Sequence, residues 1–395
     1  MRDLNLKLLE LEEAATVALA DRVRALQSSG RKIYALQTGD PDFPTPGAIV
    51  EAAHEAMRQG QTHYCNSRGL PELREAIARK YLETEGVEYD PASEILITCG
   101  GVHAYYCGLM AILNSGDEVL VPDPSWMTHV NLVRLAGGRP VRVPARPENG
   151  FLPTMSSWEK MLSARTVALV LNSPSNPTGS VACKEYLGQL CDFAARKDLY
   201  IISDEVYESI LYNGLRHTCS ASLPGAKERC LIVNSFSKTY AMTGWRIGYL
   251  AAPQRVINQA LKASQHSITN VAPFIQKAAI AALCDSTVAF AVREMTGAYS
   301  RRRDKVIRMW HESPGPVRLH EPRGAFYFFI DVRELKMPSC AIAESLLSET
   351  GVAVVPGSVY GENGEGFLRM TIAAADETIA NGFRCLLDWA AKHSS

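Results

Sequence analysis

The sequence predicts an α/β fold with a mostly parallel central sheet flanked by helices, plus a smaller α+β domain. Short apolar runs typical of buried strands alternate with helical patterns through the middle of the 395-residue chain. Strands separated by helices form parallel sheets that are covered on both faces. The C-terminal part mixes strand and helix patterns differently, and a chain of this length has room for more than one domain.

The strands of the predicted sheet are short apolar segments. We expect them at residues 95–98, 118–121, 166–171, 199–203 and 230–234. Helical patterns occupy residues 102–113, 129–135 and 183–197. In the last of these, Leu187, Leu190 and Ala194 recur at the spacing of one helix face.

The segments on either side of this region have a different character. An Ala- and Leu-rich helix is expected at residues 10–29. The Pro-rich segment 39–46 cannot form regular structure and is expected to cross between domains. A long helix starts near residue 286 and carries the basic run 301–303, which we assign to a solvated helix face.

The C-terminal part supplies the rest of the smaller domain. Strands are expected at 326–330 and 367–371, and helices at 339–350 and 376–392. We therefore expect a large domain at residues 47–285 and a small domain formed by residues 1–46 and 286–395.

Composition excludes several classes of protein. The 41 basic and 42 acidic residues give a net charge of −1, which leaves no basic footprint for nucleic acid. The 10 cysteines form no CxxC pair and are expected to be reduced, buried thiols. The charged N-terminus and the lack of a long apolar run predict a cytoplasmic protein with no membrane partner. No spacing of His and Cys residues suits a metal site.

Polar residues follow the predicted strands, where open parallel sheets bind their ligands. Gly100 and Gly101 open a helix and offer free backbone N–H groups to an anion. Ser235, Ser237 and Arg246 could add donors to the same anion, so a phosphate group is indicated.

A second set of residues indicates what carries this phosphate. Lys238 lies among the phosphate donors, where a lowered pKa would let it form a Schiff base. Asp204 ends a strand and needs a cationic partner, and Asn176 and Tyr207 could bind a phenolic oxygen. Trp126 offers a flat face for a planar ring. Phosphate, aldehyde, phenolate and pyridinium together describe pyridoxal 5′-phosphate.

Five segments make the chain resemble the class I/II, fold type I pyridoxal-phosphate aminotransferases. They are residues 173–179 (SPSNPTG), 203–207 (SDEVY), 235–238 (SFSK), 242–249 (MTGWRIGY) and 324–327 (GAFY). The resemblance extends from Leu36 to about Ala375, and within the family the chain is most similar to the aspartate aminotransferases. It implies transfer of an amino group between an L-amino acid and a 2-oxo acid.

The resemblance assigns catalytic roles to three residues. Lys238 matches the lysine that holds the cofactor as an aldimine and shuttles the α-proton by way of a quinonoid. Asp204 matches the carboxylate that keeps the ring nitrogen protonated. Tyr207, together with Asn176, matches the partners of the phenolic oxygen.

The remaining assignments concern cofactor and substrate binding. The positions that match phosphate ligands are Gly101, Val102, Ser235, Ser237 and Arg246, with Tyr64 reaching the phosphate from the neighbouring subunit of a homodimer. Arg369 matches the arginine that binds the α-carboxylate, and Gly39 a backbone contact to it. Trp126 matches a ring stacked on the cofactor, and His129 either supports Asp204 or is a core histidine.

Three positions depart from the family pattern. Val102 stands where some aspartate-specific members carry a lysine, which weakens an aspartate assignment. Arg68 replaces a small residue and either projects toward the neighbouring subunit's pocket or lies in solvent. His103 replaces a residue that is often Gln or Ser, and its role is open.

Two alternatives to amino transfer remain at this point. The same cofactor residues serve elimination or replacement at the β or γ carbon, carbon–carbon bond formation or oxidation in a biosynthetic pathway. The fold could also serve as a non-catalytic regulatory domain, but such domains usually follow a DNA-binding module or lose the lysine, and Lys238 is present.

Overall fold

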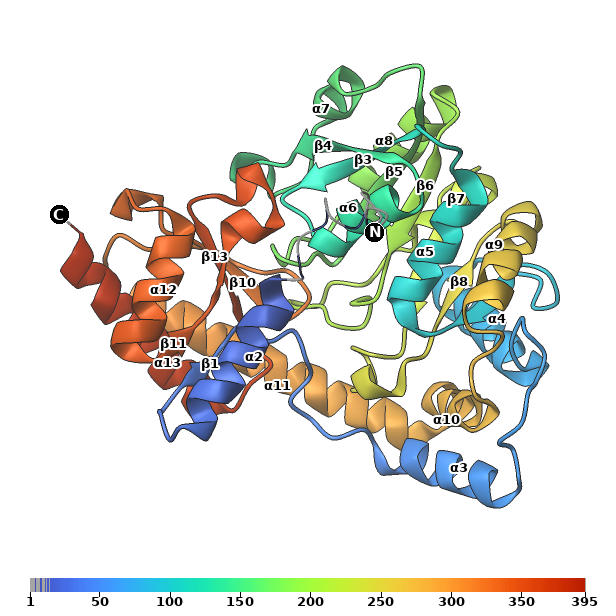
Figure 1. Cartoon of the computed structure of the whole chain (residues 1–395), viewed down its shortest axis with the longest axis horizontal. Helices are drawn as coiled ribbons and strands as arrows, with labels where there is room; N and C mark the ends of the chain where they lie inside the picture. Colours follow the sequence, from blue (N-terminus) through green and yellow to red (C-terminus); the bar gives the residue numbers. More distant parts are fainter. Residues whose placement is uncertain (1–3, 5–7, 9–10, 12, 14, 395) are drawn as a thin grey trace.

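The computed structural model describes residues 4, 8, 11, 13 and 15–394. A seven-stranded sheet forms the centre of the larger part of the molecule (Figure 1). Its strands in spatial order are β2 (Ile95–Thr98), β8 (Gly248–Ala251), β7 (Cys230–Ser235), β6 (Tyr200–Asp204), β5 (Thr166–Asn172), β3 (Glu118–Asp123) and β4 (Arg139–Pro144). All neighbours pair in parallel except β8, which is antiparallel to both β2 and β7.

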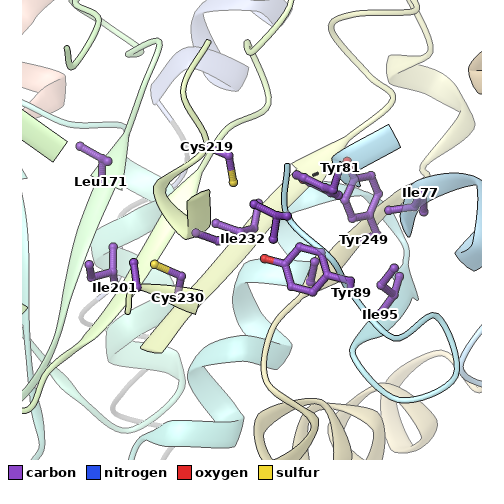
Figure 2. Close-up of a cluster of buried hydrophobic side chains, with 14 of the residues drawn as sticks. Ile77, Tyr81, Tyr89, Ile95, Leu171, Ile201, Cys219, Cys230, Ile232 and Tyr249 are labelled. Carbon is purple, nitrogen blue, oxygen red and sulfur yellow. Dashed lines mark hydrogen bonds between the residues drawn. The ribbon is translucent and has the colours of Figure 1, made fainter. Parts of the chain in front are cut away.

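Helices cover both faces of this sheet because its strands are apolar on both sides. In β5, Ala168 and Val170 face a core shared with α5 (Gly100–Ile112), α6 (Met127–Leu135) and α9 (Gln254–Ser267). Leu169 and Leu171 alternate with them and face the opposite core. That core includes residues of α3 (Gly47–Arg58), α4 (Pro71–Glu85), α8 (Lys184–Arg196) and α10 (Pro273–Cys284), with α7 (Met155–Lys160) at its edge. Figure 2 shows part of it, where Tyr81 and Tyr89 lie beside Ile232.

A smaller sheet belongs to the second part of the molecule. Its order is β12 (Val355–Pro356), β13 (Phe367–Thr371), β10 (Tyr327–Asp331) and β9 (Arg318–His320), all antiparallel. A two-stranded parallel pair joins β1 (Tyr34–Ala35) to β11 (Val352–Ala353). The helices on this side are α2 (Ala15–Ser28), α11 (Ser286–His311), α12 (Ser339–Thr350) and α13 (Asp376–His393). The N-terminal segment therefore completes the C-terminal sheet region.

The structure contains the strands and helices that the sequence predicted, together with elements that it did not. The N-terminal helix begins at Ala15 instead of residue 10, and residues 10, 12 and 14 lie outside the described residues. The elements that were not predicted are strands β1, β4, β8, β9, β11 and β12 and helices α3, α4, α7, α9 and α10. The basic run on α11 is not a solvated face, because Arg302 and Arg303 are buried against carboxylates and backbone carbonyl groups.

The described cysteines are all free thiols, but Cys183, Cys284 and Cys340 are exposed instead of buried. In the described part of the chain, no single helix is both long and apolar enough to cross a membrane. Only α10 and α11 taken together, as a pair bent by 75°, reach the required length and hydropathy.

Candidate active site

A cavity of about 440 Å³ lies where strands of the large sheet end and the smaller sheet approaches them. It is lined by every site residue predicted from the sequence except Tyr64. Residues on one face of α2 close its outer side, and Tyr327 and Arg369 come from the smaller sheet. The parallel strand ends therefore collect these residues as the sequence predicted.

Lys238 lies partly buried in this cavity, three residues after the end of β7. Its Nζ donates a hydrogen bond of 2.6 Å to the backbone oxygen of Gly39. The pKa of Lys238 is lowered to about 8, chiefly by desolvation and also by Arg369 and Arg246, while Asp40 and Asp204 act in the opposite sense. A lysine with this pKa is partly neutral near physiological pH and can react as a nucleophile.

Asp204 ends β6 at the floor of the cavity. Its Oδ2 lies 2.9 Å from Nε2 of His129, which is buried on α6 behind it. The rings of Tyr105 and Trp126 flank His129, with centroids 5.0 and 5.4 Å from that of the imidazole. His129 therefore supports Asp204, which was one of its two interpretations from the sequence.

The donors predicted for a phosphate come together at the N-terminus of α5. Ser235 and Ser237 lie with their hydroxyl oxygens 2.8 Å apart. Arg246 adopts a left-handed backbone conformation with φ of 53°, and its Nη2 would lie 2.8 Å from a Cβ added to Gly100. Gly100 itself has φ of 80°, which favours glycine at the start of this helix. Hydroxyl groups, guanidinium and helix N-terminus together fit the phosphate of pyridoxal 5′-phosphate.

Arg369 is held on the opposite side of the cavity. It donates to Oδ1 of Asn176 at 3.1 Å and to the backbone oxygen of Gln37. Its guanidinium carbon lies 4.5 Å from the ring centroid of Tyr327 and 5.4 Å from that of Tyr360. Its Nε has no partner among the described residues. A buried guanidinium with a free donor is suited to bind a carboxylate.

The residues predicted to bind the phosphate, the ring nitrogen, the phenolic oxygen and the substrate carboxylate therefore line different parts of one cavity. Asp204, Tyr207 and Asn176 would hold the ring of the cofactor, and Gly101, the two serines and Arg246 would hold its phosphate. The donors present fit pyridoxal 5′-phosphate at each of its polar groups.

Tyr64 lies outside this cavity. Its side chain is among the most exposed hydrophobic groups of the described chain, with 86% of its surface accessible. A single chain therefore does not bring Tyr64 to the phosphate donors.

Arg68 has partners within its own chain. Its guanidinium is half-buried and donates to the backbone oxygen of Ser93 at 2.9 Å and to Oδ1 of Asn258 at 3.2 Å. It therefore fastens its loop to the same chain instead of lying free in solvent, and a role toward a neighbouring subunit's pocket stays a prediction. His103 accepts the backbone N–H of Cys99 on Nδ1 at 3.2 Å and contacts the Ser267 hydroxyl at 2.9 Å.

Sequence reasoning missed several residues of the cavity. Thr16, Val17, Ala20 and Arg24 lie on one face of α2. Their spacing is helical, but nothing in the sequence indicates which face meets a cavity. Tyr327 belongs to a segment used to identify the family, but it was given no role.

Comparison with known proteins agrees with this geometry. The family model "Aminotransferase class I and II" matches residues 31–383. An aspartate aminotransferase of Pyrococcus abyssi is 44% identical over 88% of this chain and 89% of its own length. An aromatic-amino-acid aminotransferase of Thermococcus litoralis is 41% identical over 92% of this chain and 96% of its own.

Solved structures show the same relationship. The aspartate aminotransferase of Thermus thermophilus with maleate superposes with a TM-score of 0.93 at 38% identity, covering 98% of this chain and all of its own. The names of these relatives all specify amino transfer, so the other reactions of the cofactor are not favoured. The chain belongs to the class I and II aminotransferases, pyridoxal-phosphate-dependent transferases that move an amino group between an amino acid and a 2-oxo acid.

Proposed function

We propose that Lys238 is the residue that binds the cofactor covalently and moves the proton at the α-carbon of the substrate. The observation that carries this assignment is its partly buried amine, with a pKa lowered to about 8, in the cavity that the phosphate donors and Arg369 also line. Pyridoxal 5′-phosphate, when bound, supplies an aldehyde that condenses with amines and a ring that takes up electrons from the α-carbon.

The other residues bind and orient the reactants. Asp204 would hold the ring nitrogen in its protonated form, and His129 orients this carboxylate by donating a hydrogen bond to it. Arg369 binds the α-carboxylate and so directs the α-proton of the substrate toward Lys238. When the substrate amine has displaced it, Nζ of Lys238 accepts this proton and would deliver it to the carbon of the cofactor that carried the aldehyde, so that the 2-oxo acid can be released.

We infer that the substrate side chain extends toward the wall made by α2 and the start of α5. Val17 and Val102 are exposed there to 56% and 37%, and Ala20 and Arg24 line the same cavity. Arg24 pairs with Asp21 and is largely solvated, so its charge is screened. This wall favours an aliphatic or aromatic side chain over that of aspartate.

We also propose that residues 47–285 form the large domain, that residues 1–46 and 286–395 form the small domain, and that two chains associate as a homodimer. The exposure of Tyr64 supports this, because a neighbouring chain could receive the ring at its own phosphate donors. Mixing inactive Lys238→Ala subunits with weakened Tyr64→Phe subunits would test it. Activity well above the sum of the two preparations is expected, because one site of each mixed dimer is intact. Strict additivity would contradict a shared site.

The transfer itself is tested with the cofactor-bound enzyme and a panel of L-amino acids without an acceptor. Loss of the visible absorption band with one equivalent of 2-oxo acid formed per site is the expected result. Release of ammonia with continued turnover would contradict amino transfer.

A further inference from the structure

Tyr327 joins two parts of the site that have different tasks. Its hydroxyl oxygen lies 2.9 Å from that of Tyr207, and its ring faces the guanidinium of Arg369 at 4.5 Å. Sheet geometry fixes this arrangement, because Tyr327 on β10 pairs with Thr371 on β13. Arg369, two residues before Thr371, projects from the same face of the sheet and reaches the Tyr327 ring.

The hydroxyl of Tyr327 has one group near it that can accept its proton in a hydrogen bond, the hydroxyl of Tyr207. Among the described residues its hydroxyl has no hydrogen-bond partner besides Tyr207. A Cβ on Gly39 would overlap this hydroxyl, so the chain passes close to it on the other side. Each tyrosine has one proton to donate. If Tyr207 gives its proton to the ring oxygen of the cofactor, the bond between the two tyrosines must use the proton of Tyr327.

We propose that Tyr327 is a positioning residue that donates its hydroxyl proton to Tyr207, aligning Tyr207 as donor to the ring oxygen, while its ring positions Arg369 for the α-carboxylate. A hydroxyl that accepts one hydrogen bond becomes a better donor of the next. One side chain thus links the group that binds the cofactor to the group that binds the substrate. This inference rests on the roles proposed above for Tyr207 and Arg369.

Burial raises the pKa of both hydroxyls, so each tyrosine keeps its proton and can act as a donor. The direction of the bond between them follows from which hydroxyl gives its proton to the ring oxygen.

The test uses the cofactor-bound Tyr327→Phe variant, which keeps the ring and removes the proton. The readout is the pH at which the visible band changes. A hydroxyl donor favours the form with more negative charge on the ring oxygen, which is the form present after proton loss. Weakening this donor should raise the transition by about 0.5 to 1 pH unit, the effect of one hydrogen bond. The affinity for a carboxylate without an amino group, such as 3-phenylpropionate, should be unchanged.

Tyr327→Leu removes the ring as well. It should show the same spectral shift and, in addition, a roughly 3- to 30-fold weaker affinity for 3-phenylpropionate, because the cation–π contact with Arg369 is lost. Tyr299→Phe is the matched control, since Tyr299 is buried beside Phe326 and its hydroxyl has no partner among the described residues. It should change neither quantity.

A double variant tests the order of the chain of donors. Tyr207→Phe should shift the transition more than Tyr327→Phe, and adding Tyr327→Phe to it should shift it no further. An unchanged transition in Tyr327→Phe, or shifts that add in the double variant, would overturn the inference while the unmodified enzyme still transfers amino groups. An unmodified enzyme without a visible band would overturn the cofactor assignment together with it.

Discussion

Nε2 of His129 lies 2.9 Å from Oδ2 of Asp204, and both side chains are buried. Nδ1 of His129 has no partner among the described residues. The hydrogen bond runs from Nε2 to the carboxylate, because a carboxylate oxygen accepts. Asp204 is thereby held in a fixed orientation facing the cavity.

Replacing His129 with Phe would keep the ring volume and remove this donor. We expect kcat to fall about 10- to 100-fold, because the buried carboxylate loses a hydrogen bond and its orientation. Steady-state kinetics with the best amino donor measure this. His54→Phe, an exposed position on α3, serves as control. Equal kcat values in the two variants would show that His129 only fills space.

The pKa of Lys238 predicts how the cofactor-free enzyme takes up pyridoxal 5′-phosphate. Burial lowers this pKa to about 8 from the ordinary 10.5, and only the neutral amine attacks the aldehyde. The rate of appearance of the visible band should therefore rise with pH and level off above about 8, falling toward tenfold per unit below it. Stopped-flow mixing at several pH values measures this rate. An increase that continues to pH 10 would contradict a lowered pKa.

His217 and Glu205 form a buried pair on the far side of β6, with Nε2 and Oε2 2.8 Å apart. Burial lowers the pKa of His217, but the contact with Glu205 outweighs burial, and the pKa of His217 is raised overall. Burial raises the pKa of Glu205, but the contact with His217 outweighs burial, and the pKa of Glu205 is lowered overall. The stability due to His217 is complete below its unfolded pKa and is lost as pH rises through the raised one. The part due to Glu205 is lost as pH falls through its lowered pKa.

A His217→Gln variant should therefore unfold more easily near neutral pH, by about 3 kcal/mol, because Glu205 keeps its buried charge without a cationic partner. This difference in stability should shrink at higher pH, where His217 of the wild type loses its proton and no longer forms a charged pair with Glu205. Urea unfolding of both proteins between pH 5 and 9 measures it. A stability difference that does not depend on pH would contradict a charged pair.

Val102→Lys would place a cation on the apolar wall of the cavity. We expect the ratio of kcat/KM for aspartate to that for leucine to rise at least tenfold, because the distal carboxylate gains a partner and the aliphatic chain loses an apolar contact. Met110→Lys is the matched control, since Met110 is similarly exposed on the same helix and does not line the cavity. A ratio that moves equally in both variants would place the substrate side chain elsewhere.

The site was predictable from the sequence because its residues follow strands whose ends meet at one sheet edge. The uninterrupted apolar run through Ala168, Leu169 and Val170 indicated a strand buried on both faces, and such strands pair in parallel. Once the strands were placed, Asp204 and Lys238 had to lie near each other. Local pattern and topology together were sufficient for these positions.

The predictions that were wrong or missing concern residues whose contacts are with residues distant in the sequence. Arg302 reads locally as part of a solvated basic run, yet it forms a two-pronged pair with Asp42 and a third bond to Asp376. Arg68 likewise has partners far along the chain. Strand β8 was missed because only four residues, beginning with Gly248, form it, and its pairing with β2 and β7 defines it.

The most direct test of the account follows a single amino-transfer event at Lys238. The cofactor-bound enzyme is mixed with an L-amino acid that serves as donor, and the decay of the visible band is compared with that of Lys238→Ala, with Lys262→Ala on the exposed part of α9 as control. We predict that the wild type and Lys262→Ala form 2-oxo acid at the same rate, and that Lys238→Ala binds the cofactor but is slower by at least a thousandfold, since the group that moves the α-proton is gone. Unimpaired 2-oxo acid formation by Lys238→Ala would contradict the central claim.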